Sequence, residues 1–113
     1  MQQPVAGFHG SAVCSFRVKC LDAAGLEIAV RGELDLHTVT TFEVVVQECL
    51  AEGRPIVLDL LGVTFIDRAA LRAIEGLPRR TRAAVTLAAT SPCVDRLMRL
   101  AGPADVDGER LVG

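Results

Sequence analysis

The segment Pro55-Ile56-Val57-Leu58-Asp59-Leu60 decides the fold class of this chain of 113 residues. Its short, continuous apolar run is typical of a central parallel strand that is covered on both faces. Residues 61–66 are expected to bend the chain away from this strand, and Asp67 stands where an N-cap residue would begin a helix. This order of strand, bend and capped helix predicts a strand–helix unit of an α/β protein.

The residues upstream of this segment predict a hairpin. Apolar and polar side chains alternate from Phe16 to Cys20 and again from Leu26 to Leu34, which is the two-residue period of a half-buried strand. Between the two runs, Asp22-Ala23-Ala24-Gly25 supplies residues that favour a turn. The two strands are therefore expected to pair in antiparallel orientation.

A first helix is expected between the hairpin and the central strand. From Val39 to Leu50 the apolar residues recur at helical spacing, and Gly53 follows the last of them. Its N-cap is either Thr38 or Thr40, because Glu43 lies three residues after Thr40 and would complete a capping box. The sequence does not decide between the two threonines.

Downstream of Asp67, two further helices flank another strand. The apolar residues between Ala70 and Leu77 form one stripe of a helix, which Pro78 and the arginines after it are expected to end. Residues 84–88 are expected to form a buried strand. Ser91-Pro92 supplies an N-cap and a first-turn proline for a third helix, which Gly102-Pro103 should stop.

These elements predict a small α/β sandwich: an N-terminal hairpin followed by βαβ units, with four to five mostly parallel strands and three or more helices. Residues 14–113 are expected to form a single domain. Residues 1–13 show no period and are expected to form a loose N-terminal arm. The tail around Leu111 adds one short strand or none.

The charges are unevenly distributed along the chain, although they sum to −2. Residues 1–59 hold four basic and eight acidic side chains, whereas residues 60–100 hold seven basic and three acidic ones. An isoelectric point near 5.6 and the lack of aromatic residues after Phe65 argue against nucleic-acid binding. The basic side chains of residues 60–100 are either simply solvated on one helix face or contact a charged partner. Those expected on the exposed stripe of the helix are Arg68, Arg72 and Arg79.

No set of residues suggests an enzyme. The phosphate-binding pattern G-x-x-x-x-G-K-[ST] and the dinucleotide pattern G-x-G-x-x-G are both lacking, and His9 and His37 have no partners at metal-ligand spacing. We therefore expect a non-catalytic protein without cofactor or metal. No apolar run approaches the length of a membrane span and no signal peptide is visible, which predicts a cytoplasmic protein without membrane insertion.

The cysteines are expected to be buried and unreactive, because they lack the close C-x-x-C pairs of metal and redox sites. Cys93 would lie in the first turn of a helix, where a thiol pKa falls, but packing is the favoured explanation. Redox control stays an open alternative for the four residues, which are Cys14, Cys20, Cys49 and Cys93.

Two segments place acidic residues at turns between buried elements: Gly32-Glu33-Leu34-Asp35 with Thr38, and residues 59–67. Helix capping would account for Asp35 and Asp67. Together with Ser91-Pro92-Cys93-Val94-Asp95-Arg96-Leu97, however, the order and spacing resemble the STAS domain, the family of sulfate transporters and anti-sigma factor antagonists. The resemblance runs from about Phe16 to Gly102 and implies a STAS-like sandwich.

In bacterial members of this length, the resemblance implies transcription regulation through protein–protein interaction. Such a protein binds an anti-sigma factor of the serine-kinase type, and the kinase phosphorylates the first serine of an Asp-Ser-Ser-Gly turn. Here the turn is Asp67-Arg68-Ala69-Ala70. Arg68 has no hydroxyl group, so the usual position is not phosphorylatable, and its positive charge does not mimic a phosphate.

The resemblance also indicates which residues contact the partner. An anti-sigma factor is the expected partner, and the alternative is that the chain is a cytosolic STAS subunit of a membrane transporter complex. The expected partner-binding residues lie in the two turns and the helix that follows the second one: Asp35, His37, Asp67, Arg68, Ala69, Leu71 and Arg72.

Overall fold

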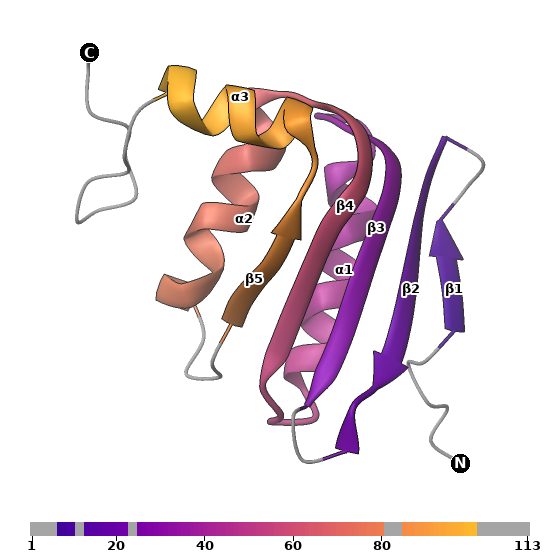
Figure 1. Ribbon diagram of the computed structural model, residues 1–113. Helices are drawn as coiled ribbons and strands as arrows, with labels where there is room; N and C mark the ends of the chain where they lie inside the picture. The colour runs from indigo at the N-terminus through magenta and orange to yellow at the C-terminus, as the bar shows by residue number, and fades with distance from the viewer. Residues whose placement is uncertain (1–6, 11–12, 23–24, 81–84, 102–113) are drawn as a thin grey trace.

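The computed structural model describes residues 7–10, 13–22, 25–80 and 85–101, and for residues 7–10 and 78–80 it describes the backbone alone. These residues form strands and helices in the alternating order of an α/β protein (Figure 1). The elements are β1 (Gly7–Gly10), β2 (Cys14–Cys20), β3 (Leu26–Leu34), α1 (Val39–Leu50), β4 (Ile56–Ile66), α2 (Arg68–Arg80), β5 (Val85–Thr90) and α3 (Pro92–Ala101).

The described strands form one sheet in the order β1-β2-β3-β4-β5. β2 pairs antiparallel with β1 and with β3, whereas β3, β4 and β5 are parallel to one another. Only β2 therefore points against the other strands. This confirms the predicted α/β fold with an N-terminal hairpin, a mostly parallel sheet and three helices.

β1 was not predicted, since residues 1–13 were expected to form a loose arm. In the structure, Gly7–Gly10 pairs with β2, with His9 opposite Phe16. A short strand with glycine at both ends shows no alternation of apolar and polar side chains, so its pairing through backbone hydrogen bonds leaves no periodic signal in the sequence.

The described helices leave one face of the sheet open, contrary to the expectation that β4 is covered on both faces. Figure 1 shows α1 and α2 behind the sheet and α3 across its upper end. The crossovers β3-α1-β4 and β4-α2-β5 advance across the sheet in the same direction, so right-handed connections place both helices on one side. Leu58 is accordingly buried, whereas its neighbours Val57 and Asp59, which point to the other face, are half-buried.

The boundaries of three predicted elements differ from those observed. β4 does not bend away at residues 61–66 but runs on to Ile66, with irregular pairing against β3. α2 continues through Pro78 to Arg80. Proline has no backbone N–H to donate, but at this position the missing hydrogen bond lies in the last turn, where little of the helix follows it. β5 is an edge strand whose central residues 86–88 are exposed, so it is not the buried strand expected. Ala84, Gly102-Pro103 and the tail around Leu111 lie outside the described residues.

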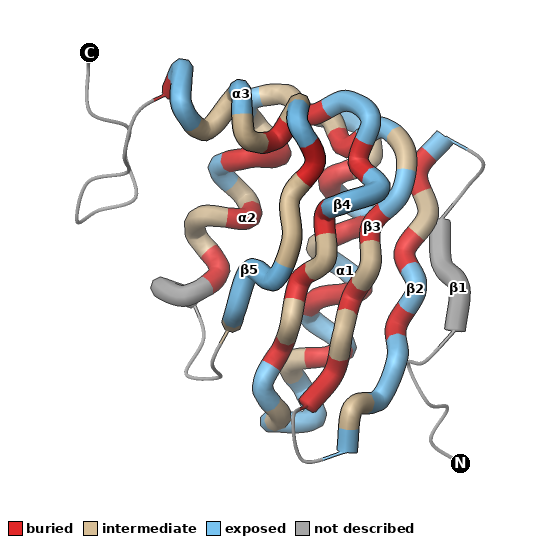
Figure 2. Tube along the Cα trace, in the orientation of Figure 1, coloured by how far each residue is buried: buried red, intermediate tan, exposed pale blue. Residues whose placement is uncertain are grey.

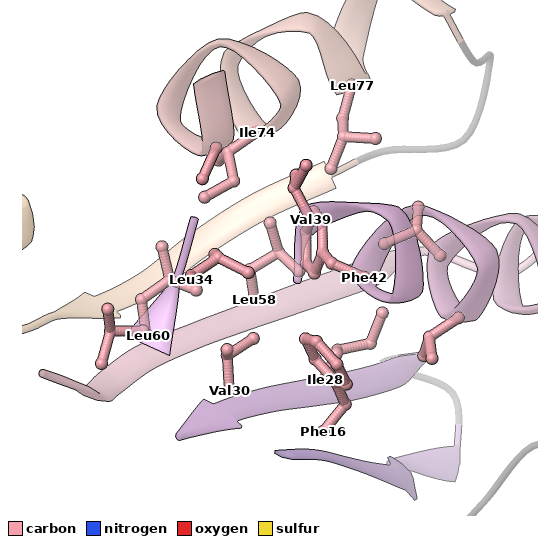
Figure 3. Packing of buried hydrophobic residues seen from close by; sticks show 14 of the residues in the cluster. Phe16, Ile28, Val30, Leu34, Val39, Phe42, Leu58, Leu60, Ile74 and Leu77 are labelled. Atoms are coloured by element: carbon pink, nitrogen blue, oxygen red, sulfur yellow. The ribbon is translucent and has the colours of Figure 1, made fainter. Parts of the chain in front are cut away.

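The core fills the space between the sheet and the helices (Figure 3). Phe16 of β2 and Phe42 of α1 are fully buried, and their ring centroids lie 5.9 Å apart. Figure 2 shows buried and less buried positions alternating along β3 and β4, as expected for strands with one covered face. The largest buried side chains are Phe16, Phe42, Leu26, Ile28, Leu34, Ile56, Leu58, Leu60, Leu71, Leu77, Val30 and Val46.

Candidate functional site

The two acidic turns meet at one end of the sheet, where β3 and β4 both terminate. The strands are parallel neighbours, and Leu34 is paired with Ile66 at their carboxyl ends. The Asp67 amide donates a hydrogen bond of 3.3 Å to the Leu34 carbonyl, which joins the two turns directly. The carboxyl ends of parallel strands are where open α/β sheets usually carry their binding sites.

The first turn is held by Asp35 and Thr38. One carboxylate oxygen of Asp35 accepts hydrogen bonds from the amides of His37 (2.9 Å) and Thr38 (3.0 Å). The pKa of Asp35 is lowered, chiefly by the hydrogen bond from the Thr38 amide. Desolvation acts in the opposite direction, and the hydrogen bond from the His37 amide lowers the pKa further. The Thr38 hydroxyl donates to the Glu33 carbonyl (2.8 Å) and accepts from the Asp35 amide (2.8 Å). The turn is therefore a closed network in which Asp35 stays ionised.

The start of α1 resolves the choice between the two threonines. Thr38 is the residue that precedes the helix, and Thr40 lies inside it. The Thr38 hydroxyl makes no capping bond to α1, because it is directed back to Glu33. Residues before the helix, and not a capping box, thus shape this turn.

Asp67 caps α2 and also binds the first turn. One carboxylate oxygen accepts the Ala70 amide (2.9 Å), which is the expected N-cap hydrogen bond. The other oxygen accepts the Leu36 amide (2.8 Å), 31 positions earlier in the chain. Capping therefore accounts for only half of what this carboxylate does, since it also fixes the position of one turn relative to the other.

The structure brings the predicted partner-binding residues to this end of the sheet, with one exception. His37, Arg68 and Arg72 are exposed, while Asp35, Asp67 and Ala69 are half-buried. Leu71 is only 1% exposed and contributes to the core, so its side chain is not available to a partner. The 3.6-residue period of α2 explains this correction, because it places Leu71 on the buried face of the helix together with Ala70 and Ile74. The Arg79 side chain is outside the described part of the chain.

Two apolar residues at this end were missed by the sequence analysis. Leu36, in the first turn, is 62% exposed, and Phe65, two residues before Asp67, is 50% exposed. In the sequence, their exposure could have been suspected because the leucine stands inside a polar turn and the phenylalanine just before the second acidic turn. Large exposed apolar side chains next to charged ones are typical of protein-binding surfaces. We call the set Leu36, His37, Phe65, Arg68 and Arg72 the apical surface.

A third turn, between β5 and α3, packs against β4. The Cys93 thiol donates to the Val63 carbonyl (3.3 Å) and lies 3.3 Å from the Ser91 hydroxyl. The Thr90 hydroxyl donates to the Asp95 carboxylate in the first turn of α3. The two contacts of the Cys93 thiol hold this half-buried side chain against β4, in agreement with a packing role.

The other cysteines differ in exposure. Burial raises the pKa of the Cys14 thiol and raises that of Cys49 to about 11. Cys20, the last residue of β2, is exposed, contrary to the expectation that all four cysteines are buried, and an Arg54 guanidinium nitrogen lies 3.9 Å from its sulfur. The described residues contain no group of side chains that could hold a metal ion.

These environments predict the order in which the thiols react. At pH 8, iodoacetamide should alkylate Cys20 first, because the buried thiols of Cys14 and Cys49 stay protonated and inaccessible. Peptide mass spectrometry over time measures the order. Cys20→Ser should remove the fast phase, and labelling of Cys49 as fast as Cys20 would contradict the prediction.

Removing the Asp67 carboxylate should loosen both turns. Asp67→Ala is expected to lower the free energy of unfolding by about 1–2 kcal/mol, the typical effect of a lost N-cap. Asp67→Asn is the matched control, since its amide oxygen still accepts from Ala70 while its amide nitrogen cannot accept from Leu36. Urea denaturation should place the asparagine variant between wild type and alanine, and equal stability of the two variants would show that the Leu36 bond contributes nothing.

None of the described helices has the length and apolarity needed to cross a bilayer. None of the curated proteins compared with the chain matches it. A family model of the STAS domain matches residues 16–108, which include most of β2, the strands β3, β4 and β5, and both acidic turns. STAS domains are generally non-catalytic binding or regulatory domains, in agreement with the geometry of the apical surface. By its sequence match and its fold, this chain belongs to the STAS domain family.

Proposed function

We propose that this chain is a regulatory protein of the anti-sigma factor antagonist type, which binds an anti-sigma factor of the serine-kinase class in the cytoplasm. The observation that supports the proposal is the apical surface. It combines exposed leucine and phenylalanine side chains with two arginines, and the Asp67 carboxylate holds the two turns beneath them together. Because the two turns are already fixed in place, less conformational entropy is lost when the partner binds.

Arg68 makes this binding independent of phosphorylation. It is the first residue of α2 and is exposed, at the position where bacterial anti-sigma factor antagonists of the STAS family carry the phosphorylated serine. An arginine offers no hydroxyl oxygen to attack the γ-phosphate of ATP, so the kinase cannot modify this position. Its guanidinium carries five N–H donors suited to carboxylates. The proposed antagonist therefore binds constitutively, through an acidic residue of its partner.

Charge reversal at Arg68 tests the proposal. Arg68→Glu should weaken binding to the purified anti-sigma factor by about tenfold or more, which corresponds to about 1.4 kcal/mol. Lys19→Glu is the matched control, because it makes the same charge change on an exposed residue in the last part of β2, away from the apical surface. Isothermal titration calorimetry measures both affinities. Equal affinities of the two variants would contradict a role for Arg68.

Phosphorylation provides a second measurement. With the partner kinase and labelled ATP, wild type should take up no phosphate, while Arg68→Ser combined with Ala70→Gly should gain it. Label on the wild-type chain would overturn the proposal of constitutive binding. Co-purification of a permease or a transport ATPase in place of an anti-sigma factor would favour the transporter alternative.

A further inference from the structure

The end of the sheet opposite the apical surface carries two of the four cysteines. Cys20 is the last residue of β2 and pairs with Leu26, the first residue of β3. Cys49 lies one residue before the end of α1. Figure 1 shows the ends of β2 and α1 at the lower end of the sheet, whereas the apical surface lies where β3 and β4 terminate. The two cysteines are therefore remote from the apical surface.

The side chain of Cys20 belongs to the face of β2 that α1 covers. Phe16 and Val18 are buried on this face, and Cys20 follows them at the two-residue spacing of a strand. Phe16 packs on Phe42 of α1, with ring centroids 5.9 Å apart (Figure 3). Cys20 therefore points toward the helix layer, in which Cys49 is fully buried.

The directions of β2 and α1 bring the two cysteines to the same level. β2 is antiparallel to β3, and so is α1, because it returns the chain from the end of β3 to the start of the parallel strand β4. From Phe16 to Cys20 the strand rises about 13 Å. From Phe42 to Cys49 the helix rises about 10 Å in the same direction. Beyond the contact of the two phenylalanines, the two cysteines thus lie side by side.

Electrostatic effects agree with this placement. The pKa of the Cys49 thiol is raised to about 11, chiefly by burial, and the negative charges of Glu52, Glu48 and an ionised Cys20 contribute to the rise. The interaction between two charges weakens with distance, so Cys20 is a near neighbour of Cys49.

Arg54 connects Cys20 to the segment that follows α1. One guanidinium nitrogen of Arg54 lies 3.9 Å from the Cys20 sulfur and 3.8 Å from a carboxylate oxygen of Glu52. The Glu52 amide in turn donates a hydrogen bond of 3.1 Å to the Cys49 carbonyl. The end of β2 and the last turn of α1 are therefore held together through these contacts.

The two thiols differ in their access to solvent. Cys20 is exposed, whereas Cys49 is 0% exposed. An oxidant in solution therefore reaches Cys20 first. Cys49 lies in the last turn of α1, and helix ends open more readily than helix interiors, so its thiol can reach an oxidised neighbour. An accessible cysteine beside a second cysteine that resolves it is the usual arrangement in redox sensors.

We infer that Cys20 and Cys49 form a reversible disulfide when the protein meets a hydroperoxide. The Cys20 thiolate attacks one peroxide oxygen, the O–O bond breaks, and the sulfur becomes a sulfenic acid. Cys49 then attacks the Cys20 sulfur and the S–O bond breaks. With hydrogen peroxide, two electrons pass from the two sulfurs to the peroxide, and its oxygens leave as two waters that carry the two thiol protons. Exchange with a small thiol reduces the bond again, as is usual for transient disulfides in a reducing compartment.

The disulfide would fasten the sheet to the helix layer. It joins the last residue of β2 to the last turn of α1, and such a cross-link restricts the unfolded chain. The oxidised protein should therefore unfold at a higher urea concentration than the reduced protein. A lower midpoint for the oxidised protein would contradict the inference, because it would show that the native fold does not accommodate the bond.

Peptide mass spectrometry identifies the pair directly. Trypsin does not cut before Pro55, so Cys20 falls in residues 20–31, Cys49 falls in residues 32–68, and the other two cysteines fall in peptides of their own. Dilute protein is treated with hydrogen peroxide, its remaining thiols are blocked with N-ethylmaleimide, and it is digested without reductant. The expected product is the 20–31 peptide linked to the 32–68 peptide, and it should be lost after treatment with dithiothreitol.

Three variants separate the two steps. In Cys49→Ala the linked peptide should be lost, and dimedone, which traps sulfenic acids, should label Cys20 persistently because nothing resolves it. Cys20→Ser should lose both the linked peptide and the dimedone label; this position is exposed, so the variant should fold. Cys14→Ala is the matched control, since Cys14 lies on the same face of β2 but at its other end, and it should retain the linked peptide.

Three results would overturn the inference. The first is a dimer of two chains joined through Cys20, and the second is a link from Cys20 to Cys14 or Cys93 in equal yield. The third is oxidation of Cys20 while Cys49 stays a free thiol. The proposed function is tested at Arg68 with reduced protein, so either proposal can fail without the other.

Discussion

Phe42→Ala is expected to lower the free energy of unfolding by about 3–5 kcal/mol, the usual cost of truncating a buried phenylalanine. Phe42 is 0% exposed and packs on Phe16 of the neighbouring strand, with ring centroids 5.9 Å apart. Truncation removes this ring contact and leaves a cavity between α1 and the sheet. Domains are stable by only about 5–15 kcal/mol, so the variant should unfold at much lower urea concentrations.

The same helix offers a matched control. Val44 lies two residues after Phe42 but is 53% exposed, so Val44→Ala should change the free energy of unfolding by no more than about 0.5 kcal/mol. Urea denaturation followed by circular dichroism measures both variants. Similar losses of stability in the two would contradict the packing of α1 described here.

Gly32→Ala should cost about 2–4 kcal/mol, because two effects add at this position. Gly32 has a φ of +98°, which side-chain-bearing residues rarely adopt. An added Cβ would also lie 2.1 Å from the Val13 carbonyl oxygen, the acceptor of the Glu33 amide. Relieving this contact requires the backbone to move just before the turn that carries Asp35, so the apical surface should be disturbed as well.

Gly53→Ala separates the two effects. Gly53 also has a positive φ, +70°, but an added Cβ there would meet no atom within 4 Å. Its substitution should therefore cost only the conformational strain, about 1–2 kcal/mol. The difference in unfolding free energy between the two variants measures the steric part, and a difference of zero would show that the backbone near Val13 yields without cost.

The apical surface was predictable only in part. A carboxylate three residues before Ala70 and an aspartate three residues before a threonine are local patterns, so the N-cap role of Asp67 and the turn held by Asp35 follow from their spacing. The hydrogen bond from the Leu36 amide to the Asp67 carboxylate does not follow from spacing, because it depends on two parallel strands that end side by side. The exposure of Leu36 and Phe65 also required the structure, since apolar residues usually predict burial.

The same contrast explains where the predicted fold was wrong. An apolar run such as residues 56–60 shows that a strand is buried but not whether a helix covers one face or both. That depends on the direction in which successive crossovers advance across the sheet. The bulge after Asp59 is invisible in the sequence because it exists only as a mismatch in pairing with β3.

The sequence by itself determined the class of the fold, the hairpin, the three helices and the absence of a hydroxyl group at residue 68. These features depend on side-chain period, capping and residue chemistry, which are properties of neighbouring residues. Only the tertiary structure decided which face of the sheet is open, which side chains form the apical surface and that Leu71 is buried. Each of these depends on contacts between residues far apart in the chain, and such contacts form only when the elements pack together.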